Sequence, residues 1–190
     1  RRIRRVEILG ASTERGLDVV AWFDQLRQNG RLPLASAEDV RRFVMALASP
    51  LLRLELPGLL GIYWFHGPSG SGKDFLVTLL TAIWKNASTP GFRTTSEIRD
   101  PSGDEDRKTL GANPDVLYVR LKEAGKKAPQ LIESLIQYTG SNEISVRRLY
   151  RDESSIPNAF TWIADSVESI PDRKEISRRT VAVQVAKMDP

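Results

Sequence analysis

The feature that most constrains this chain is a glycine-rich loop between a strand-like segment and an apolar-faced helix. Residues 61–65 are short, apolar and aromatic and are bounded by glycine, which is typical of a buried strand. Residues 67–73 follow with the sequence Gly-Pro-Ser-Gly-Ser-Gly-Lys, and residues 74–85 then place leucine and isoleucine at helical spacing. A strand, a tight loop and a helix in this order predict an α/β fold.

The loop has the G-x-x-x-x-G-K pattern of a phosphate-binding loop, the Walker A pattern, in the context that the pattern requires. Glycines let successive backbone N–H groups point at one polyphosphate, and the N-terminus of the following helix adds partial positive charge. Lys73 places a full charge on the β- and γ-phosphates. The alternative is a Gly/Ser-rich turn that binds nothing. The predicted nucleotide-binding residues are Gly67, Pro68, Ser69, Gly70, Ser71, Gly72, Lys73 and Asp74.

Asp74 departs from the Walker A pattern, which has Ser or Thr at this position to bind Mg²⁺ through a hydroxyl. A carboxylate can hold Mg²⁺ directly or through water, so Asp74 is a candidate metal ligand. It also brings negative charge close to the phosphates. Asp74 is alternatively a residue that only starts the helix. The sequence therefore supports nucleotide binding more firmly than it supports a metal geometry or a hydrolysis rate.

Hydrophobic spacing predicts further elements on both sides of the loop. The expected helices are residues 17–26, 36–47 (ending before Pro50) and 129–140. The further expected strands are residues 116–119, 144–150, 159–164 and 181–186, with a turn at 155–158. Residues 88–114 have the composition of a loop. Together these predict a helical N-terminal segment at residues 1–54 and a P-loop core with a mainly parallel sheet at residues 55–190.

Composition narrows the kinds of site that the chain can form. It has no cysteine and a single histidine, His66, which excludes a thiol nucleophile, a cysteine metal site and a site with two imidazoles. Its apolar runs are too short to span a bilayer, so we expect a cytoplasmic protein with no membrane partner. The net charge of +4 permits nucleic-acid binding but does not require it.

From Lys122 onward, the order of sequence features resembles the superfamily 3 helicases, which are P-loop ATPases of the AAA+ type. The chain is most similar to their poxvirus-type primase-helicase branch, common in phages, plasmids and integrative elements. The resemblance covers residues 60–186 and implies an AAA+-like, three-layer α/β core. Besides the Walker A loop, it is carried by residues 123–127 (EAGKK), 135–140 (LIQYTG), 143–151 (EISVRRLYR), 160–165 (FTWIAD) and 178–179 (RR).

The resemblance implies that Glu123 is the catalytic glutamate, orienting water for attack on the γ-phosphate, and a second Mg²⁺ ligand. The family has acidic residues directly after the second strand, whereas this chain has Arg120 there, so Glu123 is alternatively an exposed helix-start residue. Asp165 occupies the position of the family's polar sensor, which is usually Asn. Aspartate can accept a hydrogen bond from water but cannot donate one to the γ-phosphate. A buried strand-end aspartate that caps the next turn is the alternative.

Two arginine-bearing segments complete the resemblance. Arg178 and Arg179 resemble the arginine finger that a neighbouring subunit inserts against the γ-phosphate, or else are two surface arginines. Residues 145–151 would form the hairpin that faces the channel of a ring, or else a salt-bridge surface between subunits. The residues implied to contact nucleic acid there are Arg147, Arg148, Tyr150 and Arg151.

These features predict an ATPase that hydrolyses a phosphoanhydride bond and acts as a helicase or translocase in replication of a mobile element. The implied cofactors are ATP and Mg²⁺. The implied partners are single-stranded or forked DNA, with RNA as the alternative, and further copies of the chain in a hexameric ring. A second hypothesis is an AAA+ switch that assembles on DNA with little unwinding, because Asp74, Arg120 and Asp165 depart from the family's pattern. A third, a small-metabolite P-loop kinase, leaves the arginine pairs unexplained.

Overall fold

The structure is a computed structural model of the 190-residue chain. It describes residues 18–55, 61–86, 95–99, 103–122, 124, 128–147, 153–170 and 174–187. The helices are α1 (Val19–Gln28), α2 (Ala37–Glu55), α3 (Lys73–Asn86), α4 (Asp104–Ala112), α5 (Ala128–Thr139) and α6 (Lys174–Ser177). The strands are β1 (Ile62–His66), β2 (Thr95–Ile98), β3 (Tyr118–Leu121), β4 (Glu143–Arg147), β5 (Glu153–Pro157), β6 (Thr161–Ser166) and β7 (Thr180–Gln184).

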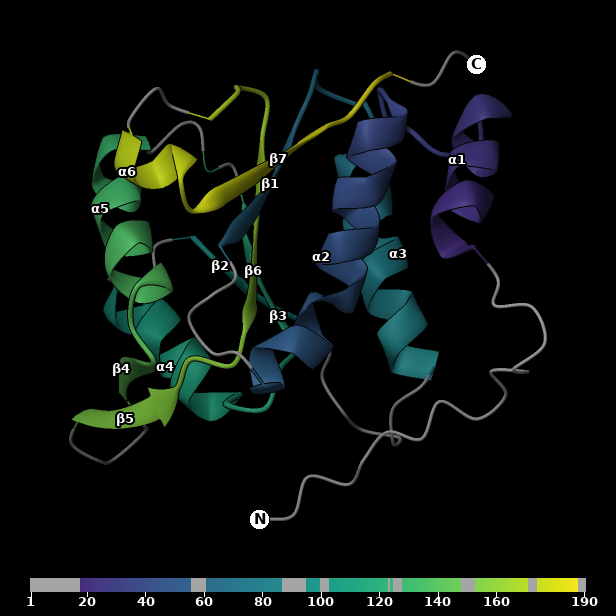
Figure 1. The fold of residues 1–190 in the computed structure, drawn as a ribbon. Coiled ribbons are helices and arrows are strands. Elements are labelled where there is room, and N and C mark those ends of the chain that lie inside the picture. Colours follow the sequence, from purple (N-terminus) through teal and green to yellow (C-terminus); the bar gives the residue numbers. More distant parts are fainter. Residues whose placement is uncertain are drawn as a thin grey trace.

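Five strands form a central parallel sheet in the order β2-β3-β6-β1-β7. The carboxyl ends of the strands lie together at one edge, which is the upper edge in Figure 1. This confirms the predicted mainly parallel sheet. Strand β6 lies between β1 and β3, so Asp165, its fifth residue, lies toward the carboxyl edge and pairs with Phe65 of β1.

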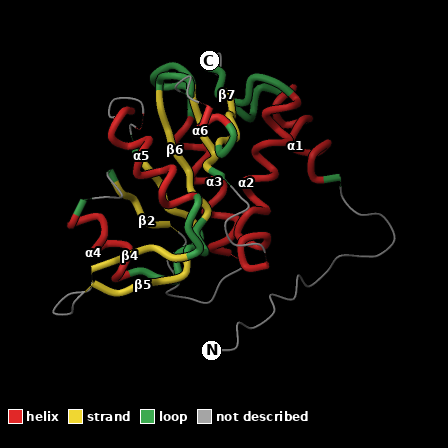
Figure 2. The backbone as a smooth tube through the Cα atoms, turned by 60° about the vertical axis from the view of Figure 1, so that its left-hand side comes forward, coloured by secondary structure: helices red, strands yellow, loops and turns green. Residues whose placement is uncertain are grey.

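Successive strand residues point to opposite faces of the sheet, and helices cover both faces. Ile62 and Trp64 of β1 pack into one hydrophobic cluster with side chains from α4, α5 and α6. Tyr63 and Phe65 pack into the other with side chains from α1, α2 and α3. Figures 1 and 2 show these two groups of helices on either side of the sheet. The predicted three-layer α/β core is therefore confirmed.

The N-terminal helices pack against the core. Asp18 caps α1 by accepting a hydrogen bond from the Ala21 backbone N–H (3.0 Å), and Ser36 accepts one from the Asp39 N–H (3.1 Å) before α2. Phe23 of α1 lies in the same cluster as Phe65 of β1. The proposed division of the chain between residues 54 and 55 stays a prediction. None of the described helices is long and apolar enough to span a membrane.

Helix α2 does not stop before Pro50, as the sequence suggested, but continues to Glu55. Proline has no N–H, so it leaves a carbonyl one turn earlier without its helical partner. Here a side chain from another element takes its place, because the Tyr118 hydroxyl lies 3.4 Å from the Ala46 carbonyl. The Trp84 indole N–H adds a hydrogen bond to the next carbonyl, that of Leu47, at 2.9 Å. Tertiary contacts thus compensate for the proline.

Residues 88–114 are not all loop, since they contain β2 and α4. Strand β2 forms by pairing with β3, and the Asp106 carboxylate accepts a hydrogen bond from the Arg99 N–H (2.8 Å) between β2 and α4. On α4 only Leu110 and Gly111 are buried. Its other positions are mostly polar, so the composition of this helix resembles that of a loop. The sequence-based expectation was wrong for these elements because their stability comes from distant contacts.

The expected turn at residues 155–158 was also wrong, because residues 153–157 form β5, which pairs antiparallel with β4. The polar Ser and Glu residues of β5 lie on an exposed hairpin, where they form cross-strand contacts such as Ser155 Oγ to Glu143 Oε2 (2.6 Å). Figure 1 shows this hairpin at the lower left, away from the upper edge of the sheet.

Candidate nucleotide-binding site

The phosphate loop joins the carboxyl end of β1 to the start of α3, and three of its glycines are required by its geometry. Gly70 and Gly72 have φ angles of 73° and 95°, a backbone conformation that side-chain-bearing residues rarely adopt. A Cβ atom on Gly67 would lie 2.2 Å from the Val185 carbonyl oxygen. These positions accept only glycine without a shift of the backbone, and they give the loop its tight curve.

The Lys73 ammonium group lies inside this curve. Its Nζ donates hydrogen bonds to the carbonyls of Gly67 (2.6 Å) and Pro68 (2.8 Å), both within the loop. The side chain therefore folds back over the loop from the first residue of α3. This places one full positive charge beside the N-terminus of a 14-residue helix, an arrangement suited to an anion.

One wall of the loop comes from the N-terminal segment, which the sequence analysis did not assign to the site. Pro33 lies against Gly72, where an added Cβ would come within 2.9 Å of the proline Cγ. Residues 33–35 are held to the end of β7 by backbone hydrogen bonds, including Ala35 N–H to Gln184 O (3.1 Å). No local sequence signal marks Pro33, because its contact depends on the packing of α2 against the sheet.

His66 is the last residue of β1 and is half-buried next to the loop. Burial is the main cause that holds the pKa of its imidazole below the ordinary value, and the Lys73 charge acts in the same direction. The Asp39 charge opposes them but does not prevail. The imidazole is therefore neutral at physiological pH.

Arg120 occupies an unexpected place beside the loop. Strand β3 runs from Tyr118 to Leu121, two residues later than the sequence suggested, so Arg120 lies within the strand and not after it. Its side chain is only 9% exposed. Its guanidinium donates to the Asp165 carboxylate (Nε to Oδ2, 2.6 Å) and to the Asp74 carboxylate. A longer contact joins Nη1 to Glu97 Oε1 at 3.4 Å.

These charges reinforce one another. Hydrogen bonding from Arg120 is the main cause that lowers the pKa of the Asp74 carboxyl. Burial alone would lower the pKa of Arg120, but the hydrogen bond to Asp74 and the Asp165 charge outweigh it, so the pKa is raised. Asp165 is as buried as Arg120, at 10% exposed, whereas Asp74 is 84% exposed. The cluster therefore has a buried half, Arg120 with Asp165, and an exposed half at Asp74.

This arrangement does not fit a Mg²⁺ ion held by these side chains. Mg²⁺ in phosphate sites is held by one or two carboxylates together with the phosphates. Asp74 and Asp165 both already bind the Arg120 guanidinium. The guanidinium that bridges the two carboxylates would repel a doubly charged ion held by them. Among the residues that the structure describes, no three acidic or histidine side chains gather as a metal site.

Among the remaining predicted catalytic residues, the two arginines do not lie beside the loop. Glu123 falls outside the described residues. Arg178 and Arg179 precede β7, whose first residue pairs with the first residue of β1, so they lie at the opposite edge of the sheet. Four residues of strand separate this edge from the loop, a distance of about 13 Å. Arg178 is exposed, whereas Arg179 donates to the Ile136 carbonyl at 2.8 Å.

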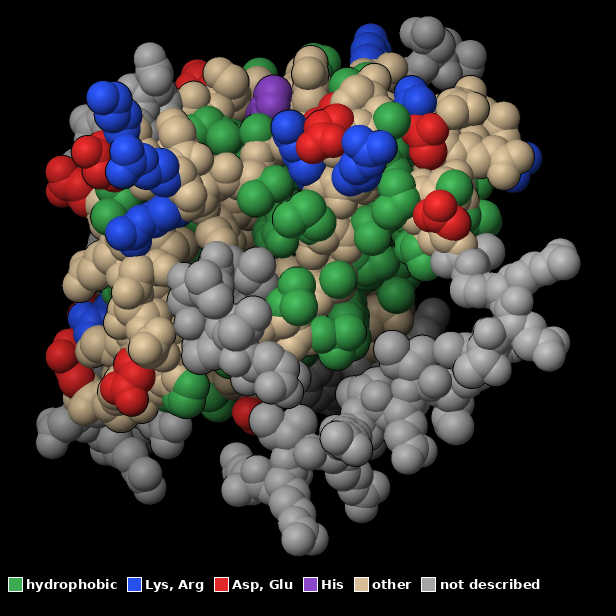
Figure 3. All heavy atoms as spheres, viewed as in Figure 1, with side chains coloured by type: hydrophobic (Ala, Val, Ile, Leu, Met, Phe, Trp, Pro, Cys, Tyr) green, Lys and Arg blue, Asp and Glu red, His purple; other side chains and the backbone are tan. Residues whose placement is uncertain are grey.

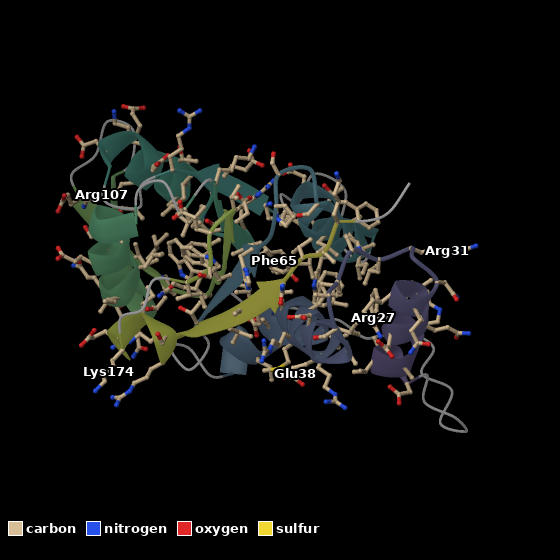
Figure 4. All side chains as sticks on the ribbon, turned by 90° about the horizontal axis from the view of Figure 1, so that it is seen from above. Arg27, Arg31, Glu38, Phe65, Arg107 and Lys174 are labelled. Atoms are coloured by element: carbon tan, nitrogen blue, oxygen red, sulfur yellow. The ribbon has the colours of Figure 1, made fainter. Side chains whose placement is uncertain are left out.

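Of the predicted nucleic-acid contacts, the structure describes only Arg147, on the β4–β5 hairpin. Arg147 is the last residue of β4, while Arg148, Tyr150 and Arg151 fall outside the described residues. Arg107 of α4 ties the hairpin to the core through Ser145 Oγ (2.8 Å) and Glu153 Oε1 (2.7 Å). Figure 4 shows Arg107 at the side of the molecule, well away from Phe65 next to the loop.

No protein-family model and no curated protein matches the sequence. The structure is similar to an apo structure of the C-terminal region of NrS-1, with a TM-score of 0.60 and 20% identity over 86% of this chain. It is also similar to C. elegans PCH-2, with a TM-score of 0.54 and 13% identity over 88%. A likeness to JCV helicase, with a TM-score of 0.43 and 17% identity, is too weak to support a shared fold.

The chain spans 38% of the NrS-1 structure and 47% of the PCH-2 structure. At these identities the likeness shows the fold alone: a P-loop α/β core with a central parallel sheet. What the chain binds and does therefore depends on the chemistry of its own residues.

Proposed function

We propose that this chain is the ATP-binding and ATP-hydrolysing module of a helicase or translocase that acts on nucleic acid in the replication of a mobile element. The observation that supports it most is the phosphate loop. Two glycines in the left-handed conformation, the amino end of α3 and the inward-facing Lys73 ammonium form a cradle for a triphosphate.

Glu123 is the proposed catalytic base, which orients water for attack on the γ-phosphate. It follows β3 by two residues, and the carboxyl end of β3 lies at the same edge of the sheet as the phosphate loop. Asp165 is the proposed sensor. Because its carboxylate binds Arg120, it would respond to the phosphates through that guanidinium and not by direct contact.

The proposed arginine finger is Arg178, and it acts on a neighbouring subunit. Arg178 is exposed at the amino edge of the sheet, so it is placed to reach another chain and not its own phosphate loop. The outer side of α2 also exposes Met45, Leu51 and Leu52, and Figure 3 shows hydrophobic side chains gathered over this helix. Such a surface suits a neighbouring copy, in keeping with a ring, which we propose to be hexameric.

The proposed nucleic-acid contacts are Arg147, Arg148, Tyr150 and Arg151. The β4–β5 hairpin stands apart from the central sheet as a separate two-stranded unit, and these residues lie at and beyond the end of β4. Arginines there would bind phosphates, and the Tyr150 ring would stack on a base. Single-stranded or forked DNA is the proposed partner.

The decisive experiment is calorimetry with ATP, followed by ATP turnover with and without single-stranded DNA. We expect binding by the native chain and a loss of at least about 100-fold in affinity for Lys73→Ala, since one charge-assisted contact to a polyphosphate is worth about 3 kcal/mol. Glu123→Gln should bind ATP with unchanged affinity but lose turnover. Absence of ATP binding by the native chain would refute the proposal.

A second candidate is a nucleotide-dependent assembly switch with little hydrolysis or unwinding. The observation that favours it is the Arg120 guanidinium, which binds both Asp74 and Asp165 where a hydrolysing site would hold a metal ion. DNA-stimulated turnover with strand displacement supports the motor. Nucleotide-dependent assembly on DNA without strand displacement supports the switch.

A further inference from the structure

Four charged side chains from four different elements meet next to the phosphate loop. Asp74 begins α3, Glu97 lies on β2, Arg120 on β3 and Asp165 on β6. Position 74 is where the Walker A pattern has the hydroxyl that binds Mg²⁺. In this chain that position holds an anion, and a guanidinium is bonded to it. Relative to the pattern, a carboxylate replaces the hydroxyl, and a guanidinium lies where the pattern has Mg²⁺.

We propose that Arg120 supplies the positive charge that a divalent cation supplies in other phosphate loops, so that this chain binds a nucleoside triphosphate without Mg²⁺. The inference rests on the proposed function, because it requires the loop to bind a triphosphate. It adds that Arg120 is the side chain that neutralises the phosphates and that the site does not need Mg²⁺.

Asp165 anchors the Arg120 guanidinium, whereas the other N–H donors of the group are held less firmly. Asp165 holds Nε at 2.6 Å, and Asp74 holds Nη2, which fixes the plane of the group. Nη1 lies 3.4 Å from Glu97, which is long for a charge-assisted hydrogen bond. The other Glu97 oxygen already accepts from Lys122 at 2.7 Å. Nη1 faces β2, on the side of β3 away from the phosphate loop, so the donor offered to a phosphate oxygen is Nη2, which becomes available when the exposed Asp74 carboxylate turns away.

The side chains at the site have no net charge without a metal ion. Asp74, Glu97 and Asp165 carry three negative charges, and Arg120, Lys122 and Lys73 carry three positive charges. A guanidinium is permanently charged and binds phosphate through parallel N–H groups, so it suits this role better than an ammonium group. These contacts recognise the phosphates and leave the base unspecified.

The test compares ATP binding by the full chain in excess Mg²⁺ and in excess EDTA, measured by calorimetry. We expect the two dissociation constants to agree within about threefold, because the cation is part of the protein. Turnover is not needed for this measurement, so it does not depend on whether the motor or the switch is correct.

Two variants identify the residues responsible. Asp74→Asn should tighten ATP binding in EDTA, because it removes a negative charge beside the phosphates; its side chain is exposed, so the fold is retained. Arg120→Lys keeps a charge but loses the planar donors, and should weaken binding in EDTA by about tenfold, the effect of losing about 1.4 kcal/mol. Added Mg²⁺ should restore part of that loss. Arg41→Lys, at an exposed arginine on α2, is the matched control and should change nothing.

Each outcome decides between the two proposals. Binding that needs Mg²⁺, or that Asp74→Asn weakens in Mg²⁺, makes Asp74 a metal ligand and overturns the inference while the proposed function stands. Equal binding that neither Asp74→Asn nor Arg120→Lys alters also overturns it, because Lys73 and the loop amides then suffice. No binding under either condition refutes the proposed function itself. If Arg120→Lys does not fold, Asp74→Asn alone decides.

Discussion

The two edges of the central sheet differ in whether one chain supplies all the residues that the proposed role of that edge requires. At the carboxyl edge, the phosphate loop, Asp74, Arg120 and Asp165 already lie together and hold one another through hydrogen bonds. At the amino edge, Arg178 is exposed, and the β4–β5 hairpin lies away from the phosphate loop. The first edge can therefore bind a ligand as a single chain, whereas the proposed role of Arg178 requires a second copy.

The two neighbouring arginines of the amino edge offer the largest expected effect. Arg178→Ala should lower ATP turnover by about 10³-fold or more without changing ATP affinity, as expected for an arginine finger. Arg179→Ala should instead destabilise the fold by about 1–2 kcal/mol, because its side chain donates to the Ile136 carbonyl at 2.8 Å. Turnover assays, calorimetry and urea unfolding of both variants check this.

Mixing the Arg178→Ala variant with a phosphate-loop variant sharpens the test. A mixture of Arg178→Ala and Lys73→Ala chains should recover some turnover, since one supplies an intact loop and the other an intact finger. If Arg178→Ala chains retain full turnover, or if the mixture shows none, the two edges do not cooperate between subunits.

Within the carboxyl edge, the buried and exposed halves of the Arg120 cluster should differ in their effect on stability. Arg120→Met removes the guanidinium that binds the buried Asp165 carboxylate and should cost about 3–5 kcal/mol of the free energy of unfolding. Asp74→Ala removes an exposed partner and should cost less than about 1 kcal/mol. Chemical unfolding of the two variants measures the difference.

A double variant tests whether the buried Asp165 charge causes the loss of stability. Arg120→Met combined with Asp165→Asn should recover much of the lost stability, because the buried carboxylate charge is then removed together with the guanidinium. A double variant no more stable than Arg120→Met would show that packing of the arginine stem, and not its pairing with Asp165, stabilises this edge.

How far the sequence predicted each feature depends on how local its cause is. The phosphate loop depends on consecutive residues, and its glycine conformations follow from the pattern itself, so the strand–loop–helix unit was predicted correctly. Arg120 pairs with Asp74 and Asp165, which are 46 and 45 residues away in the sequence. The sequence showed only that an arginine stands where an acidic residue was expected. It could not show that the arginine turns back toward the loop.

The errors in the predicted elements have the same cause. Pro50 signals a helix end, but donors from Trp84 and Tyr118 allow α2 to continue past it. Strands β2 and β5 are short and polar and form only because β3 and β4 pair with them. Local propensity fails wherever a distant partner supplies the hydrogen bonds.

The smallest expected effect concerns His66, the residue between β1 and the loop. Its pKa lies below the ordinary value chiefly because it is half-buried, so between that lowered pKa and about 6.5 the unfolded chain binds a proton that the folded chain does not. The free energy of unfolding should therefore fall as the pH drops through this window. His66→Gln lacks the titrating group, so its melting temperature should depend less on pH between about 7.5 and about 5.5. Saturating ATP should reduce the difference, because nearby phosphates favour the protonated imidazole and raise its pKa. If the two proteins give parallel pH profiles without nucleotide, His66 does not have a lowered pKa, and this part of the carboxyl edge is more open to solvent than its half-buried position indicates.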